Sequence, residues 1–315
     1  MSETCPACSH PGSRSLFHAT DRLYATTEKS FVVVECEGCG LIRLYPFPDP
    51  ADLATYYPEN YWFEPEPSTA ARLEEIYRRF VLRDHVHFVR DALRDTVPGP
   101  VLDVGCGGAL FGRLLRESGR PTVGLDFSHQ AARIGWHTNG VPVTVGDFPS
   151  TPFAPSTFAA VTMFHVLEHL YEPSAYVETA VRCLKPGGKL IVQVPNAACW
   201  QFLLFGESWN GIDVPRHLID FRDRDIDLLL DRNGFEVLRH KHFSLRDNPA
   251  GLATTLAPWL DPMARRIRKK NESPAVRLMK DLVYLGLVVA SIPPTVLEAA
   301  CGAGSTVMVE ARRRE

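Results

Sequence analysis

The stretch VLDVGCGG, residues 101–108, decides the fold of this 315-residue chain. Val101–Val104 is a short apolar run typical of a buried strand, and the helical pattern of Ala109–Gly119 begins directly after the glycines. Gly105 and Gly107 allow the backbone to approach a ligand closely, and the first turn of a helix offers unpaired N–H groups. Such a strand, glycine turn and helix form either a Rossmann-like nucleotide site or a tight structural turn.

Three acidic residues indicate what the ligand carries. The glycine loop has the spacing DxGxG rather than GxGxxG, and Asp103 inside it repels a pyrophosphate but suits an ammonium or sulfonium group. Asp126 ends the next apolar run, where doubly wound folds place a carboxylate against the ribose hydroxyls. Asp147 follows the third run, and together with Phe148 it suits the amino group and the face of an adenine. The acids therefore predict one site at the carboxyl ends of successive strands.

Short apolar runs alternate with helix-length segments from residue 101 to about residue 242. Runs without polar alternation, separated by helices, indicate a parallel sheet that is covered on both faces. One more candidate strand, Ser305–Ala311, follows a long segment, Ser244–Ala303. The earlier candidate strands are Val101–Val104, Pro121–Asp126, Val141–Val145, Phe158–Phe164, Lys189–Pro195 and Phe235–His242.

Residues 101–196 resemble the class I S-adenosylmethionine-dependent methyltransferases. The matching motifs, in family order and spacing, are VLDVGCGG (101–108), GLDFS (124–128), VGDF (145–148), HVLEHL (165–170) and LKPGGKLIVQVPN (184–196). The resemblance implies an α/β fold: a Rossmann-like, seven-stranded, mostly parallel sheet with helices on both faces. The last strand of this family is antiparallel, which would explain the late Ser305–Ala311 run.

The same resemblance implies the cofactor site. The loop with Asp103 would hold the methionine part of S-adenosylmethionine, Asp126 the ribose, and Asp147 with Phe148 would border the adenine. The cofactor residues that we expect are Asp103, Gly105, Cys106, Gly107, Asp126, Phe127, Asp147, Phe148 and His165.

Methyl transfer to a hydroxyl or an acidic carbon needs alignment and a base. His165 and His169 are four residues apart with Glu168 between them, so helical geometry would bring these side chains together. They either hydrogen-bond locally and line the cofactor pocket, or they include a catalytic His165. A third role, seen in methyltransferases with a similar segment, is that Glu168 and His169 ligate a second metal.

His217 is our candidate general base. It lies in the polar loop WNGIDVPRH, residues 209–217, at the carboxyl edge of the sheet where substrate meets cofactor. The region resembles a branch of the family that includes sugar methyltransferases, in which a loop histidine before an aromatic residue is the base. Those enzymes have a tyrosine three residues earlier, where this chain has Val214. A substrate or metal contact and a structural role are the alternatives for His217.

The amino-terminal cysteines form two C-x2-C pairs separated by 27 residues. Each pair forms a turn that presents two thiolates, and four thiolates complete the tetrahedral shell of a structural zinc ion. A vestigial or redox pair is the alternative. The remaining cysteines are scattered and no leader opens the chain, so we expect a reducing cytoplasm. The zinc ligands that we predict are Cys5, Cys8, Cys36 and Cys39.

We divide the chain into a zinc-binding module over 1–45, an aromatic linker and helical cap over 46–97, and a methyltransferase domain over 98–315. Pro98-Gly99-Pro100 is the main boundary, and an insertion at about 244–303 completes the cap of the substrate site. The aromatic run 56–62 either packs the module against the domain or forms a lid.

The insertion combines basic and apolar residues. An uncharged run, Leu282–Leu297, follows a basic cluster and is shorter than the roughly 20 residues that span a bilayer. Residues 265–297 could touch a membrane surface, but we favour a solvated helix followed by a buried cap helix. The basic cluster consists of Arg265, Arg266, Arg268, Lys269 and Lys270.

The composition is that of a soluble globular protein, with 45% hydrophobic residues and a net charge of -3, which disfavours nucleic acid as a partner. We expect a cytoplasmic enzyme that methylates an oxygen of a sugar-containing or other small metabolite. The runner-up substrate is a quinone or polyprenyl-linked lipid at a membrane surface. A cofactor-binding regulator and an RNA-binding protein are the non-enzyme alternatives, and the sequence predicts no oligomeric state.

Overall fold

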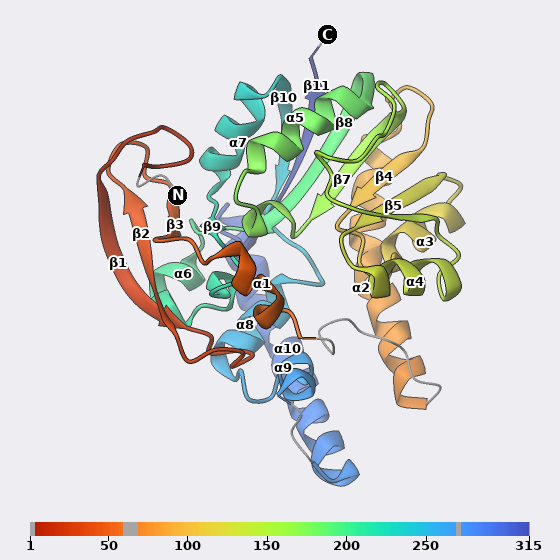
Figure 1. Cartoon of the computed structure of the whole chain (residues 1–315). Coiled ribbons are helices and arrows are strands. Elements are labelled where there is room, and N and C mark those ends of the chain that lie inside the picture. Colours follow the sequence, from red (N-terminus) through yellow and green to blue (C-terminus); the bar gives the residue numbers. More distant parts are fainter. Residues whose placement is uncertain (1–3, 59–68, 269–271, 315) are drawn as a thin grey trace.

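A computed structural model describes residues 4–58, 69–268 and 272–314. Its largest element is a seven-stranded sheet with the strand order β10-β11-β8-β7-β4-β5-β6 (Figure 1). The strands from β4 to β8 are parallel, whereas β11 runs antiparallel to both of its neighbours, β8 and β10. The strands are β4 (Val101–Val104), β5 (Thr122–Asp126), β6 (Val143–Val145), β7 (Phe158–Phe164), β8 (Leu184–Pro195), β10 (Phe235–Lys241) and β11 (Thr306–Arg313).

This topology confirms the Rossmann-like fold and its antiparallel last strand. The central strands are buried over their full width, as in Leu102, Val161 and Ile191, because helices cover both faces of the sheet. Continuous burial is the reason that the sequence of these strands shows no polar alternation. The flanking helices are α3 (Leu110–Glu117), α4 (His129–His137), α5 (Pro173–Cys183) and α7 (Asp223–Arg232).

A second, four-stranded sheet lies at the amino terminus, in the order β1-β2-β3-β9 (Figure 1). Its strands are β1 (Ser13–Thr20), β2 (Ser30–Cys36), β3 (Ile42–Leu44) and β9 (Ile219–Asp220), all antiparallel. The first three come from the expected zinc-binding module, but β9 follows the loop that contains His217. The amino-terminal strands are therefore continuous with the rest of the molecule.

Helices from two distant parts of the chain lie near the carboxyl edge of the large sheet. They are α2 (Thr69–Ala92), which precedes the sheet, and the insertion helices α8 (Asn248–Leu256), α9 (Pro262–Ile267) and α10 (Pro274–Ala300). The linker adds a 3-10 turn, η1 (Pro50–Asp52), and a short helix, α1 (Leu53–Tyr56). Tyr61 and Trp62 of the aromatic run lie outside the described residues. Short elements near the site are η3 (Leu167–His169), α6 (Trp200–Phe205), η4 (Gly206–Ser208) and η5 (Asn210–Ile212).

The expected buried cap helix is wrong. Residues 282–297 belong to α10, which projects from the molecule in Figure 1 and buries one face, through Val288, Ser291 and Thr295. The opposite face is apolar and exposed: Leu282 is 59% exposed and Val289 is 56% exposed. Among the described helices, α10 has the length and composition to cross a membrane, a weak test that core helices of soluble proteins also pass.

Candidate functional site

The glycine loop after β4 is shaped by close approach. Gly105 has a φ of 69°, and a Cβ there would lie 2.5 Å from a methyl group of Val166, so a side chain does not fit. Gly107 donates its N–H to Asp126 Oδ2 at 2.8 Å, and the Ser128 N–H donates to Asp126 Oδ1 at 2.9 Å. The loop and the end of β5 therefore hold each other in place through the Asp126 carboxylate.

Asp103 lies beneath this loop with 4% of its surface exposed. Thr162 on the neighbouring strand donates its hydroxyl to Asp103 Oδ1 at 2.7 Å. Burial raises the pKa of Asp103 to about 7, although the Thr162 hydrogen bond opposes this rise. A cationic ligand would relieve the cost of this buried charge, as the sequence analysis expects.

One cavity of about 680 Å³ opens over the carboxyl edge of the sheet. Asp147 is outside its wall, but Asp147 Oδ1 accepts a hydrogen bond from the hydroxyl of Tyr176, which is in the wall. The expected cofactor residues in the wall are Asp103, Gly105, Cys106, Gly107, Asp126, Phe127, Phe148 and His165. The structure thus brings eight of the nine to one cavity.

The other end of the cavity is lined by α2 and by the insertion. Tyr77, Val81 and Met263 give this end apolar surface. Two acids also line the cavity, but both already have partners. Asp261 accepts a hydrogen bond from the Ala264 N–H at 2.7 Å and so caps α9, and the Glu75 carboxylate lies within 3.9 Å of two arginines. Four cationic side chains reach the same wall: Arg78, Arg246, Arg266 and Arg277. Arg266 belongs to the basic cluster that the sequence shows, but no pattern in the sequence predicts that these four arginines meet.

His165 also lines this cavity. Its φ is 56°, and its ring contacts Glu168 Oε1 at 3.2 Å and the Gln193 amide nitrogen at 3.0 Å. Asp247 Oδ1 is 3.5 Å from Nε2. Burial alone would lower the pKa of His165, but the Asp247 and Glu168 carboxylates outweigh it and raise this pKa to about 9. The two carboxylates favour the protonated ring, and the catalytic role of His165 stays a prediction.

His217 lies behind the cavity wall. It is 8% exposed, and its ring centroid is 4.7 Å from that of His169, which is in the wall. Glu168 is 1% exposed, and one ligand atom from each of Glu168, His169 and His217 lies within 4.8 Å of the other two. The structure therefore groups His217 with Glu168 and His169, a pairing that the separation of about 50 residues concealed. The base role of His217 stays a prediction.

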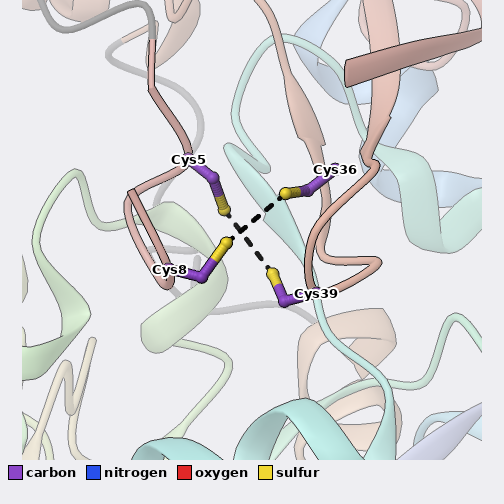
Figure 2. Close-up of side chains that lie close together, drawn as sticks. All are labelled: Cys5, Cys8, Cys36 and Cys39. Carbon is purple, nitrogen blue, oxygen red and sulfur yellow. Dashed lines mark hydrogen bonds between the residues drawn. The ribbon is translucent and has the colours of Figure 1, made fainter. Parts of the chain in front are cut away.

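The four predicted zinc ligands converge, as Figure 2 shows. The sulfur atoms of Cys5 and Cys39 are 3.7 Å apart, and those of Cys8 and Cys36 are 3.6 Å apart. A tetrahedral zinc ion with bonds of about 2.3 Å separates its sulfur ligands by about 3.8 Å, so the residues fit this ion. Burial opposes ionisation of Cys36, but backbone N–H groups of Cys39 and Gly38 lower its pKa to about 6.

Arg216 joins the amino-terminal sheet to the loop of His217. Its guanidinium group is fully buried, 2.8 Å from Asp21 Oδ1 and 2.6 Å from Asp213 Oδ1. It also lies 4.4 Å from the centre of the Tyr24 ring. Sequence reasoning missed this network because Asp21 and Arg216 carry no motif and are 195 residues apart.

Known proteins share the sheet and its motifs. A family model described as a methyltransferase domain matches residues 74–240. A probable S-adenosylmethionine-dependent methyltransferase of Mycolicibacterium smegmatis is 28% identical over 180 residues, 57% of this chain and 61% of that protein. A ubiquinone biosynthesis O-methyltransferase of Idiomarina loihiensis is 34% identical over 125 residues, 38% of this chain and 49% of that protein.

A solved SAM dependent methyltransferase from Archaeoglobus fulgidus has the same fold, with a TM-score of 0.50 and 16% identity over 78% of this chain and 100% of that chain. The chain spans between about half and three-fifths of the length of the two curated relatives. The family model covers more than half of this chain, which confirms the family resemblance and supports an enzyme. The chain belongs to the methyltransferase-domain family, the class I S-adenosylmethionine-dependent methyltransferases.

Proposed function

We propose that the protein transfers a methyl group from S-adenosylmethionine to an oxygen of a small acceptor that carries a carboxylate or phosphate group. A sugar-containing metabolite of this kind is the first candidate. The observation that supports this proposal is the cavity with two unlike ends, one lined by Asp103 and Asp126 and the other by arginines. The family match makes an enzyme a better explanation than a regulator or an RNA-binding protein.

The residues of the cofactor end fit S-adenosylmethionine, which supplies an activated methyl group when it is bound. Asp103 would face the cationic part, Asp126 the ribose, and Phe148 the adenine. Asp126 is held by two backbone N–H groups, so its position is fixed before a ligand arrives. A fixed site lowers the entropic cost of aligning two reactants.

The arginine end would orient the acceptor. Arg246 is 44% exposed and lies 3.3 Å from Asp247, and Arg277 at the start of α10 is exposed. Guanidinium groups bind carboxylates and phosphates through paired N–H donors. An anionic group held there would direct the rest of the acceptor toward the cofactor end.

This proposal is tested with pairs of acceptors that differ only in the anionic group. We expect Arg246→Met and Arg277→Met each to raise KM for the anionic acceptor about tenfold, because each removes one charge-assisted contact. The affinity for S-adenosylhomocysteine should stay unchanged. Arg94→Met removes an arginine that is 77% exposed and outside the cavity wall, and it is the matched control. Equal turnover of the uncharged acceptor would rule out this proposal.

A second candidate substrate is a quinone or polyprenyl-linked lipid at a membrane surface. The exposed apolar face of α10 favours it, since this helix also contributes Arg277 to the cavity wall. The relative from Idiomarina loihiensis is named as a ubiquinone biosynthesis O-methyltransferase. Turnover that requires lipid vesicles would favour this candidate over a water-soluble acceptor.

We also propose a structural zinc ion at the four cysteines. The sulfur separations of 3.6 and 3.7 Å support it. A closed shell of four thiolates leaves no position for a substrate, so the ion would stabilise the amino-terminal sheet.

A further inference from the structure

Glu168, His169 and His217 form a second cluster of potential ligands, apart from the four cysteines. Glu168 and His169 belong to η3, at the carboxyl edge of the sheet, and His217 belongs to the loop before β9. One ligand atom from each residue lies within 4.8 Å of the other two. We propose that these three side chains bind a divalent metal ion of the zinc type.

The two imidazole rings are held in the form that binds metals. His169 Nδ1 is 2.9 Å from the carbonyl oxygen of Arg216, and His217 Nδ1 is 2.7 Å from the carbonyl oxygen of Gly211. A carbonyl oxygen only accepts hydrogen bonds, so His217 Nδ1 carries the hydrogen. His169 Nδ1 also lies 3.0 Å from the Tyr57 hydroxyl, which can donate or accept, and the Arg216 carbonyl favours the hydrogen on this nitrogen. In the neutral rings, both Nε2 atoms then keep a free lone pair. Metal-binding histidines are oriented in this way by hydrogen bonds from their other ring nitrogen.

The carboxylate of Glu168 provides an independent observation. Glu168 is 1% exposed, and its Oε1 accepts a hydrogen bond from His165 Nδ1 at 3.2 Å. Its Oε2 is buried and has no hydrogen-bond partner among the described residues. An anionic oxygen that is buried without a partner is costly, and a bound cation removes this cost.

The ligand set suits zinc or a similar ion. Two imidazole nitrogens and one carboxylate oxygen are common ligands of zinc, at bond lengths of about 2.0 to 2.2 Å. Donor atoms within 4.8 Å of one another reach these lengths after small side-chain movements. The ion would join η3 to the loop of residues 209–217, directly behind the wall that His169 contributes to the cavity. We therefore assign it a positioning role.

The test measures the metal content of the 315-residue chain. After loading with cobalt and gel filtration, we expect two equivalents per chain, one with the absorption of thiolate-bound cobalt and one without it. His217→Gln should lose one equivalent and keep the thiolate absorption. His137→Gln changes an exposed histidine on α4 and is the matched control, which should retain both. Equal metal content in wild type and His217→Gln would overturn the proposal.

A second measurement, on the wild-type protein, tests the proposal even if the His217→Gln variant does not fold. Crystals of the wild-type protein soaked in zinc should show an anomalous difference peak between Glu168, His169 and His217. Soaked crystals without such a peak would also overturn the proposal. Both readouts are independent of methyl transfer, so failure of the proposed acceptor leaves this inference standing, and the reverse also holds.

Discussion

At the scale of a single residue, we expect Asp103 to make cofactor binding depend on pH. Burial raises its pKa from 3.8 to about 7, so the folded protein keeps a proton that the unfolded chain has lost. The carboxyl group therefore costs the free protein stability as the pH rises from 3.8 to about 7. A bound cationic ligand stabilises the ionised carboxylate of Asp103, so it favours loss of this proton. We expect the affinity for S-adenosylmethionine to rise by up to about tenfold per pH unit below pH 7 and to level off above it.

Calorimetric titrations at several pH values measure this profile. Asp103→Asn keeps the shape of the side chain but carries no charge, so it should weaken binding and flatten the profile. Asp95→Asn alters an exposed carboxylate beyond the end of α2, and its profile should match that of the wild type. A steep profile that survives in Asp103→Asn would assign the proton to a different group.

The sequence predicted that Asp103 and Asp126 lie together but not that Arg246 and Arg277 line the same cavity, and the difference has a physical cause. Asp103 lies one residue before the end of β4 and Asp126 ends the adjacent parallel strand β5, so a local pattern places them together. Arg246 and Arg277 belong to a loop and to α10, which reach the cavity only through tertiary packing. No spacing along the chain relates them to Gly105.

At the scale of elements, the exposed face of α10 predicts that the protein binds to a membrane surface. Its exposed face includes Leu282 and Val289, and no charged residue lies between Asp281 and Glu298. Apolar surface beside basic residues favours binding to anionic lipid. We expect the wild-type protein to co-sediment with vesicles that contain anionic lipid, and Leu282→Glu with Val289→Glu to reduce the bound fraction severalfold.

The controls for this prediction are salt and an exposed apolar side chain on another helix. High salt should weaken binding, since part of the attraction is electrostatic. A charge-neutral change on an exposed apolar side chain elsewhere, Trp136→Ser on α4, should leave the bound fraction unchanged. If the wild-type protein stays in the supernatant even with anionic lipid, the membrane role of α10 is excluded.

The sequence placed α10 correctly as an apolar segment but assigned it to the interior. Apolar residues occupy every face of residues 282–297, so no helical period shows which face packs. The central strands β4 and β7 were predictable because burial on both faces leaves short, continuous apolar runs in their sequence. The two-residue β9 was not predictable, since it is defined by its partner β3.

At the scale of the whole molecule, the amino-terminal sheet and the methyltransferase sheet are connected through the loop of residues 209–221. β9 adds this loop to the small sheet, and Arg216 binds Asp21 of the amino-terminal segment as well as Asp213 of its own loop. The amino-terminal sheet therefore supports the part of the chain that carries His217, although among the described residues none of the four clustered cysteines lines the cavity. This arrangement predicts that the amino-terminal sheet acts on the site through the stability of the loop.

Arg216→Met tests that connection. It leaves the buried carboxylates of Asp21 and Asp213 without their cation, and removing one partner of a buried pair costs about 3 to 5 kcal/mol. Urea unfolding should show this loss, while Lys29→Met, which breaks the exposed pair with Asp52, should change little. Hydrogen exchange should increase in residues 209–221 and in β3 before it increases in β4. An increase confined to the amino-terminal sheet would mean that the two sheets are stabilised separately, because Arg216 would then hold only one of them.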